Sequence, residues 1–327
     1  MERRTVLKLA LGTALGTSVG SGLVRPASAA TKDIVYLTPG LDLPFWRALS
    51  RGVEAVAKDK GFTAQTFDSH NSAQTQLQNA QDAITRGVAG IVLSPTDSST
   101  APSVLGLAKR ANIPVVIADI GTNSGDYASF VISDNYKGAH DVGTDLAAEL
   151  KKKGWGGGSV GIVAISQARK NGQARTKGFL DGMKEGGFTG KQAGLQQMQS
   201  YTADETFKFT QDLLTANPDM RALFIQTDQP TIGALRAVKA ARREGDLLVA
   251  AFDGIPEFIN LLKSGQIVVT GMQQPYLMGT KAGDAMISVI GGTAPDKEVS
   301  VPILVVTSGN VEQDLPTIKK TVFGGEM

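Results

Sequence analysis

Short apolar runs alternate with segments of helical periodicity from Asp33 almost to the end of the chain, and this alternation constrains the fold more than any other feature. Strands that are apolar along their whole length are typical of parallel sheets covered by helices on both faces. The sequence therefore predicts an α/β fold. The expected strands are Ile34–Leu37, Phe62–Phe67, Ile91–Leu93, Val115–Ala118, Val160–Ile165, Leu223–Ile225, Leu247–Phe252 and Ile267–Val269. The expected helices include Phe45–Lys60, Gln74–Arg86, Gly138–Lys152 and Gln229–Arg243.

The 327 residues hold too many of these units for one small sheet, and the order of the units repeats. In each half a helix and an apolar strand are followed by Thr-Asp, at residues 96–97 and 227–228. The next strand then ends at Asp119 in one half and at Asp253 in the other. We expect two Rossmann-like lobes. Because ligands bind beyond the carboxyl ends of parallel strands, Asp119 and Asp253 should face one cleft.

The first 29 residues have the pattern of an export signal: a basic start, a short apolar run and an Ala-x-Ala site. Cleavage after Ala29 would release the protein into the periplasm. The arginine pair at 3–4 resembles a twin-arginine signal, whereas Glu2 and Val6 depart from that pattern. An ordinary export signal therefore stays open as an alternative.

Charge and cysteine content exclude several classes of protein. Four of the 33 basic residues and one of the 31 acidic residues lie within residues 1–29, so the rest of the chain is close to neutral. A neutral body offers no electrostatic footprint for nucleic acid or an anionic membrane. The absence of cysteine excludes disulfides, thiolate catalysis and a lipid-modified N-terminal cysteine, so we expect no membrane anchor.

No motif for a cofactor, a metal or covalent catalysis occurs. The glycine-rich segment 154–158 precedes an expected strand instead of following one, and there is no P-loop or Gly-x-Ser-x-Gly motif. The two histidines, His70 and His140, cannot form a three-histidine metal site. We expect no cofactor and no enzyme activity. One alternative is a secreted glycosidase that uses Asp119 and Asp253 as its carboxylate pair.

Several residues are suited to holding a neutral, hydroxyl-rich ligand. Carboxylates such as Asp119 and Asp253 can accept two hydroxyl hydrogen bonds each, and Arg175 can donate in a planar fork. Phe45 and Trp46 lie at the start of an expected helix and can cover the C–H face of a ring. The alternatives are a core position for the two rings, turn chemistry for the aspartates and a surface ion pair for the arginine.

From about residue 33 to about residue 310 the chain resembles the periplasmic sugar-binding proteins of the ribose-binding type, the receptors of ABC importers. The matching segments are Pro44-Phe45-Trp46, Asp68-Ser69 with Asn71, Arg86-Gly87, Pro95-Thr96-Asp97-Ser98, Ala111–Val115, Asp119, Ser133-Asp134-Asn135, Arg175 with Gly178-Phe179, Leu213–Ala216, Gly233-Ala234-Leu235, Phe252-Asp253-Gly254 and Gln273 with Pro275. The resemblance implies two lobes joined by a three-strand hinge, residues 31–133 plus 274–304 and residues 134–273 plus 305–327, which close around the ligand.

The resemblance also implies the ligand-binding residues. The stacking rings correspond to Phe45, Trp46 and Tyr201, and the hydrogen-bonding groups correspond to Asp119, Arg175, Asp253 and Gln273. Leu43, Ser94 and Thr227 stand where asparagines are expected, and Ile120 stands where an arginine is expected. Each ligand hydroxyl left without a partner would cost about 1–3 kcal/mol. These departures argue against ribose and favour a polyol, a deoxy sugar or a bulkier sugar derivative.

The partners implied by the resemblance are a small neutral carbohydrate or polyol and an ABC permease with its ATPase, and we expect a monomer. A periplasmic sensor that presents a sugar or furanosyl-type signal to a membrane receptor remains an alternative, since both roles use the closed form. A transcription regulator with the same ligand domain is disfavoured, because the export signal stands where a DNA-binding headpiece would be needed.

Overall fold

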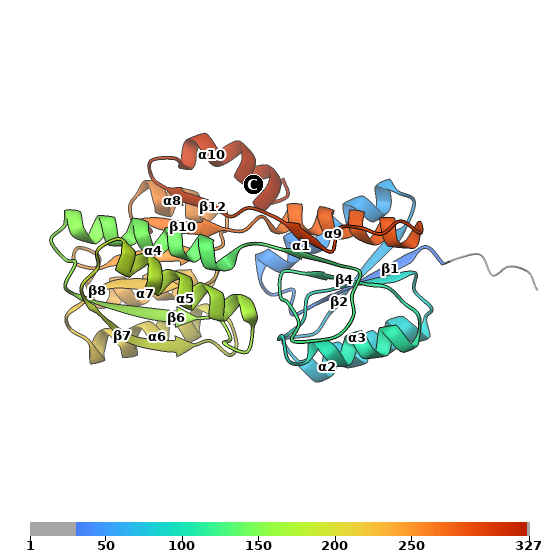
Figure 1. Ribbon diagram of the computed structural model, residues 1–327. Coiled ribbons are helices and arrows are strands. Elements are labelled where there is room, and N and C mark those ends of the chain that lie inside the picture. Colours follow the sequence, from blue (N-terminus) through green and yellow to red (C-terminus); the bar gives the residue numbers. More distant parts are fainter. Residues whose placement is uncertain (1–30, 326–327) are drawn as a thin grey trace, which may run out of the picture. The chain divides into compact units, whose positions relative to one another are not determined.

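Figure 1 shows the computed structural model, in which residues 31–325 are described. The expected export signal at residues 1–29 lies outside the described residues. The chain from Thr31 onward forms one compact unit. It contains two six-stranded sheets, each flanked by helices (Figure 1).

The first sheet is parallel throughout and has the strand order β11-β5-β4-β3-β1-β2. Its strands are β1 (Asp33–Thr38), β2 (Thr63–Asp68), β3 (Gly90–Leu93), β4 (Val115–Ala118), β5 (Ser129–Ile132) and β11 (Glu298–Ser300). Its helices are α1 (Pro44–Asp59), α2 (Ala73–Thr85), α3 (Ala101–Arg110) and α9 (Pro275–Ile290).

Both faces of this sheet are buried, which explains the continuous apolar runs in the sequence. Successive side chains of a strand point to opposite faces. Ile34 and Tyr36 of β1 therefore pack in the core formed with α1 and α9. Val35 and Leu37 of the same strand pack in the core formed with α2 and α3.

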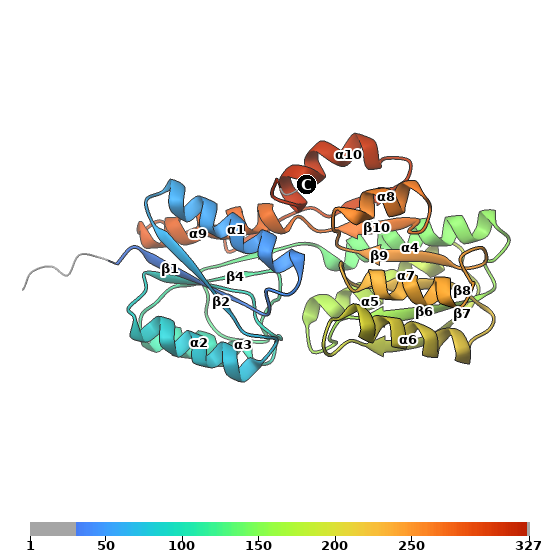
Figure 2. The same cartoon turned by 180° about the vertical axis from the view of Figure 1, so that it is seen from behind.

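The second sheet has the order β12-β10-β9-β8-β6-β7, and only β12 runs antiparallel, against β10. Helices α4 and α5 pack on one face, and α6, α7 and α8 lie on the other (Figures 1 and 2). The strands are β6 (Ser159–Ala164), β7 (Lys191–Gln197), β8 (Met220–Ile225), β9 (Leu248–Phe252), β10 (Val269–Met272) and β12 (Leu304–Thr307). The helices are α4 (Asn135–Lys152), α5 (Lys170–Glu185), α6 (Ala203–Ala216), α7 (Thr231–Ala240), α8 (Glu257–Lys263), α10 (Val311–Thr317) and the π-helical turn η1 (Ile318–Val322).

The chain passes from one sheet to the other three times (Figure 1). The first passage lies between β5 and α4, the second between β10 and α9, and the third between β11 and β12. Residue 304, where the sequence suggested a lobe boundary, is the first residue of β12.

The expected α/β fold with two largely parallel sheets is confirmed, and so are the four expected helices, whose ends shift by at most three residues. Four strands were not expected: β5, β7, β11 and β12. Strand β7, with the sequence KQAGLQQ, lies at the edge of its sheet and is only partly buried, so it needs no apolar run. The run expected at Ile267–Val269 overlaps β10 only at Val269.

Candidate functional site

Polar side chains gather where the carboxyl ends of the two sheets face each other. Asp119 follows β4, Asp253 follows β9 and Gln273 follows β10, and all three are buried. Both aspartates have left-handed backbones, with φ of 65° and 61°. Short polar side chains such as Asp tolerate this conformation better than most residues. The two halves therefore present matching carboxylates at matching strand ends.

Arg175 is the centre of the polar network. It projects from α5 and is 2% exposed. Its Nη1 donates to Asp253 Oδ2 at 2.9 Å and to the carbonyl oxygen of Gln226 at 2.7 Å. Its Nη2 donates to Gln273 Oε1, and its Nε donates to Asn135 Oδ1 at 2.8 Å. The guanidinium also lies 4.0 Å from the ring centre of Phe252, the residue before Asp253. A buried cation with this many partners is fixed in place.

Two amide side chains hold Asp119: Asn171 of helix α5 and Gln273, which follows β10. Asp119 Oδ1 accepts from Gln273 Nε2 at 2.7 Å, and Asp119 Oδ2 accepts from Asn171 Nδ2 at 3.0 Å. Burial raises the pKa of Asp119, and the nearby charge of Arg175 opposes that shift. Gln273 connects the two halves directly, because it donates to Asp119 and accepts from Arg175.

Asp253 has one bonded oxygen and one free oxygen. Its Oδ2 is paired with Arg175, but no donor within residues 31–325 reaches its buried Oδ1. Burial raises the pKa of Asp253 to about 7, an effect that Arg175 opposes. The carboxylates of Asp228 and Asp119 raise it further. The amide oxygen of Asn171, Oδ1, is also buried and has no donor in the same part of the chain.

Aromatic rings from both halves border these polar groups. Phe45 and Trp46 lie in the first turn of α1, with their ring centres 4.8 Å apart and an edge-to-face angle of 81°. Tyr201 lies before α6, and its hydroxyl accepts from the backbone N–H of Ser166 at 3.1 Å. The second half also holds the start of helix α1, because the backbone N–H of Phe45 donates to Asp228 Oδ2 at 3.3 Å.

A small inner cavity of about 20 Å³ lies among these side chains, which is room for about one water molecule. Nine of the predicted site residues line it: Leu43, Phe45, Trp46, Asp119, Arg175, Tyr201, Thr227, Asp253 and Gln273. Three lining residues were missed: Ile165, Arg169 and Asn171. Asn171 could have been found, because it lies four residues before Arg175 and so on the same face of α5.

Two predicted site residues, Ser94 and Ile120, do not line the inner cavity. Ser94 is fully buried, and its hydroxyl donates to the carbonyl oxygen of Ala118 at 2.9 Å and is bonded to the Tyr36 hydroxyl at 3.0 Å. Ile120 packs in the core of the first sheet with α1 and α9. The left-handed backbone of Asp119 turns the chain so that the following side chain points into that core. Both residues thus make core or hydrogen-bond contacts beside the cavity and do not contribute to its lining.

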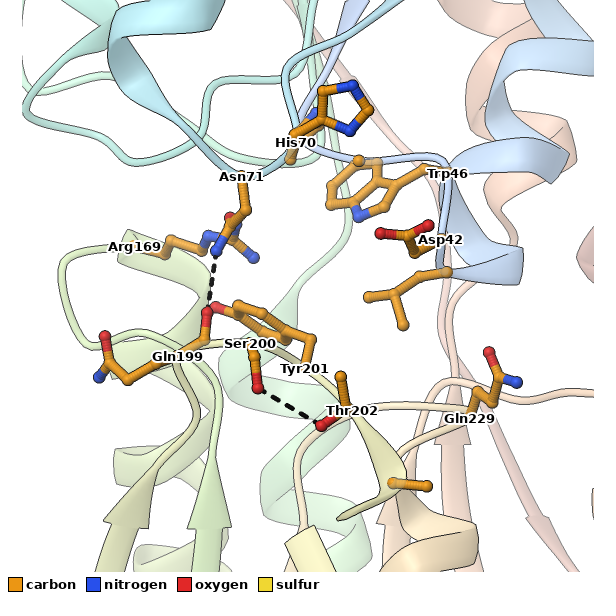
Figure 3. Close-up of a pocket in the computed structure, with 14 residues that line it drawn as sticks. Asp42, Trp46, His70, Asn71, Arg169, Gln199, Ser200, Tyr201, Thr202 and Gln229 are labelled. Carbon is orange, nitrogen blue, oxygen red and sulfur yellow. Dashed lines mark hydrogen bonds between the residues drawn. The ribbon is translucent and has the colours of Figure 1, made fainter. Parts of the chain in front are cut away.

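A larger outer cavity of about 550 Å³ adjoins the inner one, and they share Leu43, Trp46, Arg169 and Tyr201 (Figure 3). Arg169 is 4% exposed and bonds across the gap, with Nε donating to the carbonyl oxygen of Thr96 at 2.8 Å and Nη2 donating to Asn71 Oδ1 at 2.9 Å. Asn71 in turn donates to the carbonyl oxygen of Gln199 at 3.2 Å. Side chains of the two halves thus contact each other directly around both cavities.

Within residues 31–325, no group of three or more His, Asp or Glu side chains is placed to hold a metal ion. No helix in this part of the chain is long and apolar enough to cross a membrane. The site offers carboxylate and amide acceptors, guanidinium and amide donors, and aromatic faces. This combination suits the binding of an uncharged, hydroxyl-rich molecule.

Comparison with known proteins places the chain in a family. A family model described as a periplasmic binding protein domain matches residues 34–294. Ribose import binding protein RbsB of Haemophilus influenzae is 30% identical over 296 residues, which cover 90% of this chain and 98% of that protein. The protein of the same name from Escherichia coli is 30% identical over 310 residues, covering 94% and 99% of the two chains.

Solved structures agree with this placement. The Caulobacter myo-inositol binding protein, bound to myo-inositol, has a TM-score of 0.79 at 28% identity and covers 89% of this chain and 98% of its own. A carbohydrate transporter solute binding protein from Agrobacterium radiobacter shares the fold, with a TM-score of 0.82 at 24% identity and coverage of 90% and 100%. The glycosidase alternative is therefore dismissed. The chain belongs to the periplasmic binding protein family, as a substrate-binding protein of a transport system and not an enzyme.

Proposed function

We propose that the inner cavity binds a small neutral sugar or polyol, and that the protein delivers this ligand to an ABC permease and its ATPase. The observation that carries the proposal is the pair of buried acceptors, Asp253 Oδ1 and Asn171 Oδ1, that no donor in the described chain reaches. A buried polar atom without a partner costs about 1–3 kcal/mol. Two hydroxyl groups of one ligand would remove that cost at both atoms.

The rings at the border of the cavity support the same class of ligand. Trp46 and Phe45, packed edge to face against each other, line the cavity from one half, and Tyr201 lines it from the other. Aromatic faces pack against the C–H groups of a sugar ring while the polar cluster binds its hydroxyls. Relatives named for ribose, D-allose and D-apiose binding are consistent with this division.

Binding requires the two halves to move, because a sugar ring needs more room than about 20 Å³. The three passages between the sheets would act as the hinge, with residues 31–133 plus 274–304 moving against residues 134–273 plus 305–327. Opening would separate Gln273 and Asn171 from Asp119, and closure on a ligand would let its hydroxyls replace those direct contacts.

Of the four departures from the ribose-binding pattern, those at Leu43 and Thr227 line the cavity. Leu43 offers no hydrogen bond, and the Thr227 hydroxyl is bonded to Asp228 Oδ1 at 3.1 Å. A polyol, a deoxy sugar or a bulkier sugar derivative fits this lining better than ribose. We further infer that residues 1–29 direct export to the periplasm, by a twin-arginine-like signal cleaved near Ala29, and that the exported protein is a monomer. The relatives are named for import, which disfavours the sensor alternative.

The proposal is tested by calorimetric titration with D-ribose, D-allose, D-arabinose, D-fucose and myo-inositol. At least one of these should bind, and Asp253→Asn and Asn171→Leu should each weaken that binding tenfold or more, since each removes an acceptor for a ligand hydroxyl. Asp212→Asn, an exposed residue of α6, is the matched control. Binding that is unchanged in both site variants, or absent for every sugar, would contradict the proposal.

A further inference from the structure

Two loops from opposite halves of the chain meet beside the inner cavity. One loop follows β3 and contains residues 96–98, and the other follows β6 and contains residues 168–170. We refer to these two segments together as the latch. The latch adjoins the inner cavity at Arg169, but Ser98 and Lys170 do not line it. A ligand in that cavity would therefore not touch Ser98 or Lys170, and any effect of theirs on binding would act through the position of the two halves.

Three hydrogen bonds join the two segments of the latch. The backbone N–H of Ser98 donates to the carbonyl oxygen of Ala168 at 3.3 Å, and the backbone N–H of Lys170 donates to Ser98 Oγ at 3.1 Å. Arg169 Nε donates to the carbonyl oxygen of Thr96 at 2.8 Å. Ser98, Thr96 and Arg169 are all buried, so water is largely excluded from these bonds. Loss of a bond here would leave a buried polar group without a partner.

Each segment of the latch is also fixed within its own half. In the first half, the carbonyl oxygen of Ser98 accepts from the backbone N–H of Asn123 at 2.8 Å, and the Asp97 carboxylate accepts from two N–H groups of its own loop. In the second half, the Arg169 guanidinium lies 5.0 Å from the ring centre of Tyr201. The latch therefore joins two segments that are held in place, and not two free side chains.

The Ser98 hydroxyl also caps a helix of the other half. Helix α5 begins at Lys170, and its N-cap residue, Arg169, makes no side-chain cap bond. By contrast, the N-cap side chains of α2, α4 and α6 each accept from their own helix. The first N–H groups of a helix have no partner within that helix, and Ser98 supplies one for Lys170. Because α5 carries Asn171 and Arg175, the latch completes the start of the helix that holds the polar cluster.

The order of the strands places the latch away from the three passages between the sheets. In the first sheet, β3 lies two strands from β5, which leads into the first passage. In the second sheet, β6 lies three strands from β10, which leads into the second passage. Neighbouring strands are about 4.8 Å apart, so these separations are roughly 10 and 14 Å. A rotation about the passages would therefore separate the two segments of the latch, and closure would bring them together.

We propose that Ser98 is a positioning residue for ligand binding, which stabilises the closed arrangement of the two halves through the latch and fixes the start of α5. This inference rests on the proposed function, because it assumes that the halves close on a ligand. A bond formed only in the closed arrangement raises the fraction of the protein that is competent to bind, and the apparent affinity rises by the same factor. Because Ser98 does not line the inner cavity, that factor is the same for every ligand.

The first test is calorimetric titration of Ser98→Ala with each probe that binds the wild-type protein, from D-ribose, D-allose, D-arabinose, D-fucose and myo-inositol. Loss of the hydroxyl should weaken binding about three- to tenfold, and this factor should agree within about twofold among the probes. Ser103→Ala, at an exposed position on α3 of the same half, is the matched control and should leave affinity unchanged. Unchanged affinity in Ser98→Ala, or a loss that differs widely between probes, would overturn the proposal.

Lys170→Pro removes the same hydrogen bond from its donor side. Proline lacks the N–H that donates to Ser98 and suits the first position of a helix, and Arg169, with φ of −93° and ψ of 131°, has a backbone compatible with a following proline. Lys170→Met keeps the N–H and is the control for loss of the side chain. Relative to this control, Lys170→Pro should weaken binding by the same factor as Ser98→Ala, and the double variant should bind no more weakly. Additive losses would contradict the proposal.

Hydrogen exchange at the Lys170 amide distinguishes positioning from a general loss of stability. A saturating concentration of a bound probe should slow this exchange in the wild-type protein more than in Ser98→Ala, where the N–H has lost its acceptor. Equal slowing in both proteins would overturn the role of Ser98 while the proposed function stands. If none of the probes binds the wild-type protein, the proposed function fails, and the role of Ser98 fails with it.

Discussion

Asp97 and Asp228 occupy matching positions in the two halves of the chain, yet they bind different partners. Asp97 is half-buried and accepts from its own loop, from the N–H of Ser99 at 2.7 Å and the N–H of Thr100 at 2.9 Å. Asp228 is fully buried and accepts from the N–H of Phe45, in a helix of the other half. The repeat therefore places an aspartate after each strand, but the packing around it determines its partner.

The pKa shifts of these two aspartates are opposite in direction. For Asp97, burial is outweighed by the hydrogen bonds from Ser99 and Thr100, which lower its pKa. For Asp228, burial outweighs the hydrogen bonds, and its pKa is raised. The stability from Asp97 is thus present above its ordinary pKa and lost as the pH falls, whereas the charge of Asp228 costs stability as the pH rises.

Asp119 and Asp253, the second matching pair of aspartates, also differ from each other in their hydrogen-bond partners. Both oxygens of Asp119 accept from amide side chains, while Asp253 is paired with Arg175 and has one oxygen without a donor in the described chain. The half that contains Asp253 also supplies the buried cation. Four predictions sharpen this comparison of the halves, in order of decreasing effect.

Arg175→Met should lower the free energy of unfolding by about 3–5 kcal/mol, because it leaves Asp253 buried without its counter-charge. Urea denaturation followed by circular dichroism measures the loss. Arg86→Met, at an exposed position on the other half, should change stability by less than about 1 kcal/mol. A loss for Arg175→Met no larger than that of the control would mean that the ion pair is not important for stability.

Asp253→Asn should reduce the pH dependence of stability. A folded pKa of about 7 against an ordinary pKa of 3.8 means that between these pH values the folded protein holds a proton that the unfolded chain releases. Stability should therefore fall as the pH rises from about 4 to about 7, by at most about 4 kcal/mol. Denaturation at several pH values should show a shallower slope in this variant. An unchanged slope would mean that groups other than Asp253 cause the pH dependence of stability.

Asp253→Asn is also preferable to Asp253→Ala as a binding test. Truncation to alanine would leave the buried guanidinium of Arg175 without its carboxylate, so it would lower stability as well as binding. Asparagine keeps the shape and one acceptor oxygen.

In each half two helices pack closely at a glycine, so replacing that glycine should lower stability by a similar amount in both halves. A Cβ at Gly279 would lie 2.1 Å from the carbonyl oxygen of Leu49 in α1, and a Cβ at Gly182 would lie 2.0 Å from that of His140 in α4. Gly279→Ala and Gly182→Ala should each lower stability by about 1–3 kcal/mol. Gly106→Ala, with space around it in α3, should be neutral or stabilise by up to about 1 kcal/mol. Unequal losses at the two contacts would break the equivalence of the halves.

Asp228→Ala and Asp97→Ala should have the smallest effects, about 0.5–2 kcal/mol each, as expected for the loss of a few hydrogen bonds. Their effects should differ in kind. Only Asp228→Ala removes a bond between the two halves, so it alone should increase hydrogen exchange at the start of α1. Equal exchange at Phe45 in both variants would show that this contact does not hold the helix.

The sequence predicted most of the fold because buried parallel strands and amphipathic helices have strong local patterns. Of the four strands that it missed, β7 and β11 are edge strands with polar or exposed residues, which depend on pairing with a neighbour. In the site, it predicted nine lining residues from strand ends and from the family resemblance, but it included Ser94 and Ile120. Whether a side chain after a strand points into a cavity or into the core depends on backbone geometry that composition does not show.

By itself, the sequence determined the α/β class, the repeat of the strand ends and the residue types that suit a neutral ligand, because these properties are local or periodic. Only the tertiary structure decided which groups meet. It brought Asn171 to Asp119, left one oxygen of Asp253 without a donor, and opened the outer cavity beside Arg169. These features depend on contacts between residues more than 50 positions apart, and such contacts arise only when the two halves of the chain come together.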